Sequence, residues 1–158
     1  MTLKLRRVVT GHDRNGKATV LIDEMVSNVT QMRPGAEACV IWATDGFPID
    51  NDSDEDLSKR KVSTSQDNGT VFRVVSFGPG VTPRNHRTNS IDYAVVISGE
   101  LDMVLDDTTV HLRAGDILVQ RGTIHNWFNH GTEPCVIAFA LIGAKPVTIN
   151  GRTLDGHG

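Results

Sequence analysis

Apolar and polar residues alternate in short runs along most of the chain, and runs with helical spacing are scarce. In residues 109–113, for example, Val110 and Leu112 fall on one face of an extended strand and the polar residues between them fall on the other. A period of two is typical of half-buried strands, so the pattern predicts an all-β protein. The predicted strands are Arg6–Thr10, Ala18–Ile22, Ala38–Ala43, Val71–Phe77, Asp92–Ile97, Leu101–Leu105, Thr109–Arg113, Asp116–Val119, His125–Asn129 and Cys135–Ile142.

The segments between these runs predict tight turns and one long loop. Gly99-Glu100 and Asp106-Asp107 are typical of hairpin connections. Residues 46–69 are first acidic and then basic, which favours a solvated excursion over the alternative, a lid above a site. We therefore predict a single domain over residues 1–158, divided into N-terminal strands (1–45), this polar loop (46–69), the main set of strands (70–145) and a tail (146–158).

Composition excludes several classes of function. The 158 residues include 16 Lys and Arg against 19 Asp and Glu, a net charge of −3, which argues against nucleic acid as the main partner. There is no apolar run long enough to span a bilayer and no signal-peptide pattern at the N-terminus. Cys39 and Cys135 lie in apolar runs, which predicts buried free thiols and a cytoplasmic protein.

Two histidines and one carboxylate are the candidate chemical groups. His86 and Asp92 share one face if the chain is extended there, and His125 lies on a later strand. Such a set, meeting inside one barrel, would hold a divalent metal and leave positions open; the alternative is a purely structural role. Without a metal, Asp92 is the best candidate base, because Ala94 and Val96 beside it would raise its pKa.

Residues 80–99 and 115–129 resemble the two motifs of the cupin superfamily. The Gly, His, acidic and Gly positions of the first motif fall on Gly80, His86, Asp92 and Gly99. Thr88 stands where a second His is usual, and Asp92 stands where the motif has Glu. In the second motif, Gly115 and His125 match the family pattern with one residue fewer between them, and the usual Pro is absent.

The resemblance implies a jelly-roll barrel, the cupin double-stranded β-helix. It also implies a transition metal (iron, manganese, nickel or zinc) held by the remaining ligands His86, Asp92 and His125, unless the protein is a metal-free cupin. Thr88 would then position water or substrate. Small cupins usually pair as homodimers, and the strands before Gly46 are the candidate interface.

Three further residues are candidates for substrate binding. Trp127 shares the face of His125 and could stack on a flat substrate or simply pack in the core. Arg84 lies beside the first motif and could hold a carboxylate, and Gln120 precedes the second motif. The same carboxylate-binding role is open to Arg73, Arg87 and Arg121, and the alternative for each arginine is a solvated surface charge.

These observations leave three hypotheses for function. We favour a metal-assisted, redox-neutral enzyme, a dehydratase, decarboxylase or isomerase acting on a polar or acidic small molecule. The first alternative is an iron-dependent dioxygenase, and the second is a cupin that binds a small ligand without chemistry. The missing imidazole makes the site less like that of the cupin dioxygenases with a full ligand set.

Overall fold

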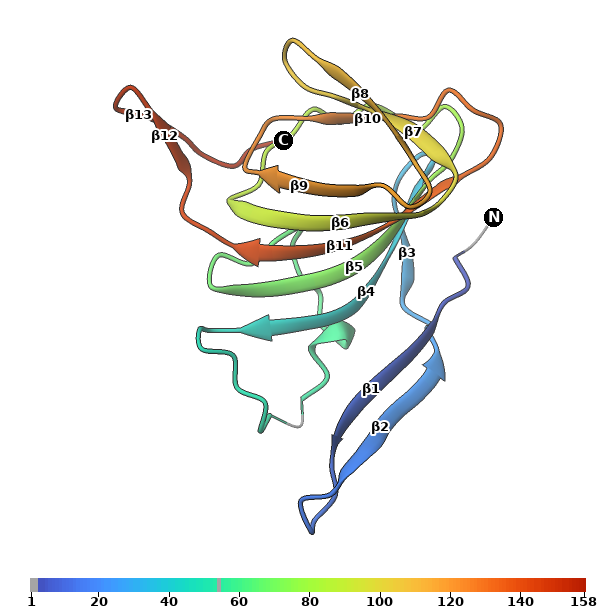
Figure 1. Ribbon diagram of the computed structural model, residues 1–158, viewed down its shortest axis with the longest axis vertical. Helices are drawn as coiled ribbons and strands as arrows, with labels where there is room; N and C mark the ends of the chain where they lie inside the picture. Colours follow the sequence, from blue (N-terminus) through green and yellow to red (C-terminus); the bar gives the residue numbers. More distant parts are fainter. Residues whose placement is uncertain (1–2, 54) are drawn as a thin grey trace.

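Two antiparallel sheets enclose the interior of the protein (Figure 1). The computed structural model describes residues 3–53 and 55–158; positions 1, 2 and 54 of the predicted domain lie outside the described residues. The larger sheet has the order β3-β4-β5-β11-β6-β9 and the smaller one β10-β7-β8. The strands of the larger sheet are β3 (Val29–Arg33), β4 (Ala36–Asp45), β5 (Gly69–Phe77), β11 (Cys135–Gly143), β6 (Ser90–Ser98) and β9 (Ile117–Arg121). Those of the smaller sheet are β10 (Asn126–Phe128), β7 (Glu100–Val104) and β8 (Thr109–Arg113).

Two hairpins complete the described strands. The first joins β1 (Arg6–His12) to β2 (Ala18–Met25) and projects away from the two sheets, whereas the second joins β12 (Val147–Ile149) to β13 (Arg152–Leu154) (Figure 1). The all-β prediction is confirmed, and each of the ten predicted strands corresponds to an observed one with ends shifted by a few residues. Three short strands were not predicted: β3, β12 and β13. They lack the buried apolar alternation that carries the signal elsewhere.

The core lies between the inner faces of the sheets. Along β6 the side chains alternate, so that Asp92, Ala94 and Val96 are buried while Tyr93 and Val95 are exposed. The strands on either side of β11 bring further apolar side chains to the same interior. The two cysteines are free and buried, as predicted from their apolar runs.

Gly99 forms the sharp turn between β6 and β7, but the hairpin predicted there is wrong, because the chain passes from the larger sheet to the smaller one and the two strands do not pair. Its φ angle of +74° lies in the left-handed region that favours glycine. A Cβ atom there would lie 2.4 Å from the carbonyl oxygen of Pro134. Both observations explain why a residue without a side chain occupies this position.

The segment between β4 and β5, residues 46–68, has two different halves. Its acidic first half is mostly exposed, as the solvated interpretation expects. The second half folds back onto the molecule: the 3₁₀ turn η1 (Leu57–Lys59) buries Leu57 and Ser58, and Thr64 contributes to the wall of the interior cavity. The polar loop is therefore in part a cover for the barrel.

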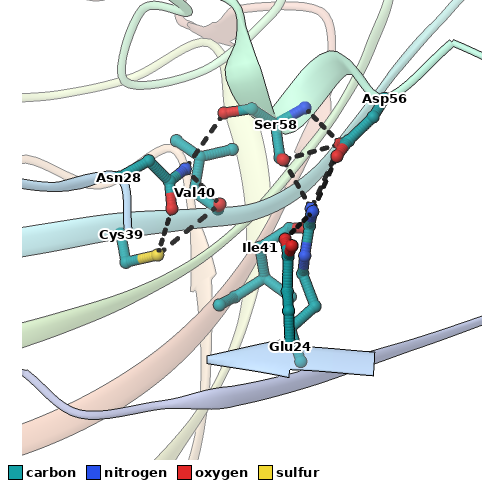
Figure 2. A network of polar contacts seen from close by, with 8 residues as sticks. Glu24, Asn28, Cys39, Val40, Ile41, Asp56 and Ser58 are labelled. Atoms are coloured by element: carbon teal, nitrogen blue, oxygen red, sulfur yellow. Dashed lines mark hydrogen bonds and ion pairs between the residues drawn. The ribbon is translucent and has the colours of Figure 1, made fainter. Parts of the chain in front are cut away.

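Arg7 ties the first hairpin to this loop through its contacts with Glu24 and Asp56, which are labelled in Figure 2. Its guanidinium is buried and donates to Asp56 Oδ2 at 2.7 Å, to Glu24 Oε1 at 2.6 Å and to the carbonyl oxygen of Ile41 at 3.1 Å. Burial alone would raise the pKa of Asp56, but hydrogen bonds from Arg7 and Ser58 outweigh it and lower the pKa to about 2. The pair is therefore charged across the ordinary pH range.

Within residues 3–53 and 55–158, no helix has the length and apolar character that crossing a membrane requires. The homodimer stays a prediction. The first hairpin, part of the candidate interface, does expose the apolar side chains of Val8, Val20, Leu21 and Met25.

We expect Arg7→Met to destabilise the protein by roughly 3 kcal/mol, because it leaves Asp56 with its main counter-ion removed in a largely desolvated position. Urea denaturation measures the loss, and hydrogen exchange should accelerate over residues 55–68. The matched control is Arg6→Met, which breaks the exposed pair with Asp23 and should cost less than about 1 kcal/mol. Equal effects of the two variants would contradict this role for Arg7.

Since the pKa of Asp56 is lowered in the folded state, its contribution is present above about pH 4 and is lost as the pH falls towards 2. The stability difference between wild type and Asp56→Asn should therefore shrink in that acidic window. A difference that does not change with pH would show that the carboxylate charge is not what anchors the loop.

Candidate functional site

A cavity of about 50 Å³ lies inside the barrel, and all seven sequence-predicted site residues line it. They come from different parts of the chain, which the two sheets bring together. Space of this size accommodates a few water molecules or a carboxylate-sized group in the conformation seen. The seven residues are Arg84, His86, Thr88, Asp92, Gln120, His125 and Trp127.

The two histidines are neighbours. The backbone N–H of His86 donates to the carbonyl of His125 and the reverse bond is also made, each at 3.0 Å. The ring centroids are 4.3 Å apart, and both side chains are buried. This reciprocal backbone pair fixes the relative position of two residues that are far apart in the sequence.

Backbone carbonyls fix the tautomer of both rings. His86 Nδ1 lies 3.0 Å from the carbonyl oxygen of Arg84, and His125 Nδ1 lies 3.0 Å from that of Thr123. A carbonyl oxygen only accepts hydrogen bonds, so each Nδ1 carries the proton and each Nε2 keeps its lone pair. Burial, with His125 nearby, lowers the pKa of His86 to about 4, and burial also lowers the pKa of His125. Both rings are therefore neutral near pH 7, with Nε2 free to accept a proton.

Asp92 is the acidic group of the cavity. Asp92 lies in β6, where it is paired with Gln120 of β9 on one side and with Leu141 of β11 on the other. Only 4% of Asp92 is exposed. Ser90 Oγ donates to Asp92 Oδ1 at 2.6 Å and lies 2.8 Å from Thr88 Oγ1. Burial raises the pKa of Asp92 to about 6, and the hydrogen bond from Ser90 opposes that shift without cancelling it. The upward direction agrees with the sequence prediction.

The three-ligand metal set finds no support in how these side chains lie. Among the described residues, no three His, Cys, Asp or Glu side chains come together closely enough to hold a metal ion. Two imidazole nitrogens alone fall short of the three protein ligands that catalytic metal sites ordinarily use. The predicted set of His86, Asp92 and His125 therefore does not fit a metal ion as these side chains lie. Whether the protein binds a metal is untested and stays a prediction.

The cavity is also rich in arginine, and part of this set was not predicted from the sequence. Arg33, at the end of β3, and Arg73, in β5, line the cavity together with Arg84. The sequence offers Arg73 as a possible carboxylate partner, and its burial between Val71 and Val75 on the inner face of its strand contradicts the alternative of a solvated surface charge. Arg33 had no such signal, because β3 itself was not predicted. Ser90 was missed for a similar reason, as it lies just before the predicted strand.

Trp127 and Gln120 form part of the wall. Trp127 is buried, packs against Phe77 and Phe139, and presents its ring to His125 with centroids 5.4 Å apart. Trp127 is thus both a core residue and a cavity residue, which combines the two alternatives left open by the sequence. Gln120 is buried and its amide nitrogen lies 3.4 Å from Met103 Sδ, a weak acceptor. Its amide therefore has hydrogen-bonding capacity left for a ligand.

A wider outer cleft leads to the cavity. Residues 60–68 of the polar loop and residues 156–158 of the tail line this cleft, which shares Thr64, Arg84 and Thr88 with the cavity. The tail is held along the first motif: the backbones of Arg87 and His157 exchange two hydrogen bonds of 2.9 Å. Access to the histidines thus runs between the loop and the tail.

The fold and the site define a class of protein: small antiparallel jelly-roll barrels with histidines that face the interior. Similarity to known proteins then identifies the family. A cupin domain model matches residues 73–142. The chain is 33% identical to the cupin-domain-containing oxidoreductase fogC of Aspergillus ruber, over 96% of this chain and 78% of that protein. It is 36% identical to phomopsin biosynthesis cluster protein C′ of Diaporthe leptostromiformis, over 95% of this chain and 84% of that protein. The protein belongs to the cupin family.

Solved structures agree on the fold. The cupin domain of Cnp3 from Schizosaccharomyces pombe superposes with a TM-score of 0.51 at 12% identity, over 87% of this chain and 86% of that one. AerE from Microcystis aeruginosa gives a TM-score of 0.52 at 21% identity, over 78% of this chain and 48% of that one. At these identities the likeness shows the jelly-roll fold alone, and the resemblance predicted from the two motifs is confirmed at that level.

We expect Asp92→Asn to stabilise the protein at neutral pH. The raised pKa means that ionising Asp92 costs stability, a cost that builds up between about pH 4 and 6 and is then constant. Asparagine removes the charge, so the variant should exceed wild type by about 2–3 kcal/mol at pH 7.5 and match it near pH 4. Urea denaturation at both pH values measures the difference.

The control is Asp107→Asn, in the exposed turn after β7, which should change stability little at either pH. If Asp92→Asn were destabilising to the same degree at both pH values, Asp92 would be a structural hydrogen-bond acceptor and not a desolvated charge.

Proposed function

We propose that this cupin is a small-molecule enzyme that catalyses a redox-neutral proton-transfer reaction, an isomerisation, dehydration or decarboxylation. The observation that carries the proposal is one buried cavity that holds the Asp92 carboxyl group and two neutral imidazoles with free Nε2 atoms. General acid–base catalysis needs groups that are poised to take or give a proton near neutral pH and that face the substrate.

The roles follow from the states of these groups. Asp92, with a pKa of about 6, is ionised at neutral pH and would remove a proton from the substrate. His86 and His125 would accept hydrogen bonds from the substrate at Nε2 and so orient it, while their Nδ1 protons stay hydrogen-bonded to backbone carbonyls. Thr88 and Ser90 form a hydroxyl pair beside the carboxylate that would orient it. Trp127 and Gln120 would contact the body of the substrate from the wall.

Solvent-exchange experiments test the proposal whichever product the proton transfer gives. Small carboxylic acids and unsaturated carbonyl compounds are incubated with the protein in D₂O and followed by NMR. We expect deuterium incorporation or isomer formation from a reactive member of the panel, with no consumption of oxygen. Asp92→Asn should slow the reaction by about 100-fold or more, the usual contribution of a general acid or base. His86→Gln should slow it less, because it changes a hydrogen-bond acceptor and not the base.

The matched control is His111→Gln. His111 is exposed on β8, where it pairs with Asp102 and Glu100 outside the cavity, so the substitution should leave the rate unchanged. If a substrate is turned over and Asp92→Asn keeps the wild-type rate, the proposed mechanism is wrong. A ligand that binds and remains unaltered through long incubation would instead favour a binding protein.

A second candidate function, an oxidoreductase, is favoured by the names of relatives. Proteins fogC of Aspergillus ruber and virC of Hypocrea virens, each 33% identical to this chain, are named cupin-domain-containing oxidoreductases. An iron-dependent dioxygenase is the form that fits the cupin family. Elemental analysis of protein prepared without chelators, combined with oxygen uptake, distinguishes the two candidates. Stoichiometric iron with substrate-dependent oxygen uptake, both lost in His86→Ala and His125→Ala, would replace the redox-neutral proposal.

A further inference from the structure

Two guanidinium groups that line the cavity have buried hydrogen-bond donors without acceptors. Arg73 is 6% exposed; its Nη2 donates to the carbonyl oxygen of Ser63 at 2.6 Å, but its buried Nε has no partner among residues 3–53 and 55–158. Arg33 Nε donates to the carbonyl oxygen of Thr82 at 2.7 Å, and its buried Nη2 has no partner in the same described part of the chain. Buried N–H groups without an acceptor are rare in folded proteins, so this pair calls for a physical explanation.

Comparison with Arg7 shows what is unusual about them. Arg7 also has a buried Nε without a partner, yet its other nitrogens bind two carboxylates, those of Asp56 and Glu24. Within the described part of the chain, neither Arg33 nor Arg73 has a carboxylate within 4.0 Å. A buried charge is costly unless it is paired. Arg7 is thus compensated by ion pairs, whereas the two cavity arginines have direct contacts only with carbonyl oxygens in the described chain, and Asp92 attracts Arg73 from a greater distance.

The charge of the cavity wall is therefore positive. Three of the residues that line the cavity are arginines, one is the aspartate Asp92, and the two histidines are neutral. Three positive charges and one negative charge give a net charge of +2. Asp92 attracts Arg73 through space but forms no ion pair with it, because strand β11 lies between their strands β6 and β5. An anion entering the cavity would meet unused N–H donors and an uncompensated field.

The remaining wall is apolar and aromatic. Trp127, Phe77 and Phe139 pack around the same space, and the guanidinium carbon of Arg33 lies 6.0 Å from the centroid of the Phe77 ring. A ligand matched to this wall carries a negative charge at one end and a compact, flat apolar body at the other. Carboxylate geometry suits a guanidinium, which presents planar, parallel N–H donors.

We infer that Arg73 and Arg33 bind the carboxylate group of a small, flat organic acid inside the barrel. The inference deepens the proposed function and rests on it, because this acid would be the substrate. It assigns an anchoring role to two residues that carry no part of the proton transfer. Arg73 supplies the principal contact, since it is the more deeply buried and its Nε faces no acceptor in the described protein.

Binding of acids and their neutral amides to the full chain tests the inference. Acrylate is compared with acrylamide, and acetate with acetamide, by calorimetry at constant ionic strength, since both acids are small enough for a cavity of about 50 Å³. Each amide has nearly the shape of its acid but no charge, so the ratio of the two affinities isolates the carboxylate. We expect at least one acid to bind at a ratio of one per chain and at least about tenfold more tightly than its amide, given the strength of charge-assisted hydrogen bonds.

Substitutions then assign the preference to the two arginines. Arg73→Met keeps the length and apolar stem of the side chain and should abolish the preference for the acid, and Arg33→Met should reduce it. Arg121→Met, at an exposed position at the end of β9, is the matched control and should keep the preference. Arg33 and Arg73 are changed separately, so if one variant fails to fold, the other still tests the assignment. The ratio of acid to amide affinity in the wild-type protein tests the inference without any variant.

Two results would overturn the inference: acids that bind no more tightly than their amides, or Arg73→Met and Arg33→Met proteins that keep the wild-type preference. Its failure is distinguishable from that of the proposed function. Asp92→Asn should lose turnover but bind the acid at least as tightly as wild type, because it removes the acidic group that lines the cavity. Turnover without a preference for acids would leave the proton-transfer proposal standing and remove only the carboxylate site.

Discussion

The interior of this barrel has to accommodate ionisable side chains away from water, and most features of the site follow from that constraint. A buried ionisable group can be neutral, can be paired with an opposite charge of the protein, or can be paired with a charged ligand when one binds. His86 and His125 take the first course, and Arg7 with Asp56 takes the second. Arg33 and Arg73 form no ion pair within the described chain, and each has a buried N–H group without an acceptor there. In this they differ from Arg7, which anchors the loop through ion pairs.

Rigid backbone contacts hold the chemical groups where this constraint acts on them. The reciprocal hydrogen bonds between His86 and His125 join two segments that no single sheet connects, and the carbonyls of Arg84 and Thr123 orient the rings. The loop before β5 and the tail close the same end of the barrel. A site built this way has fixed donors and acceptors inside and loop segments only at its entrance, which suits selective admission of small molecules.

The site lies inside a cupin barrel, and it differs from the family pattern in the residues that line it. Thr88 replaces an imidazole and is joined to Ser90 and Asp92 in a chain of polar contacts. The carboxylate is thereby engaged on its own strand and not with the imidazoles. The result is a histidine pair and a separate aspartate in one cavity, and the proton-transfer proposal rests on this arrangement. The proposed binding of an acid rests on the arginines of the same cavity.

The strands and the faces of their side chains could be predicted from residue order, because alternation along a strand is a local property of the extended backbone. This pattern correctly placed His86, Asp92, His125 and Trp127 inside, and Tyr93 outside. Short strands without buried alternation, such as β3, gave no such signal, and Arg33 was missed with them. Which inward-facing groups meet depends instead on sheet order, register and curvature, since these set the distance between strands and leave no mark in a local pattern. The two imidazoles came together and the carboxylate did not join them, because Asp92 is fixed by the register of β6 between β9 and β11.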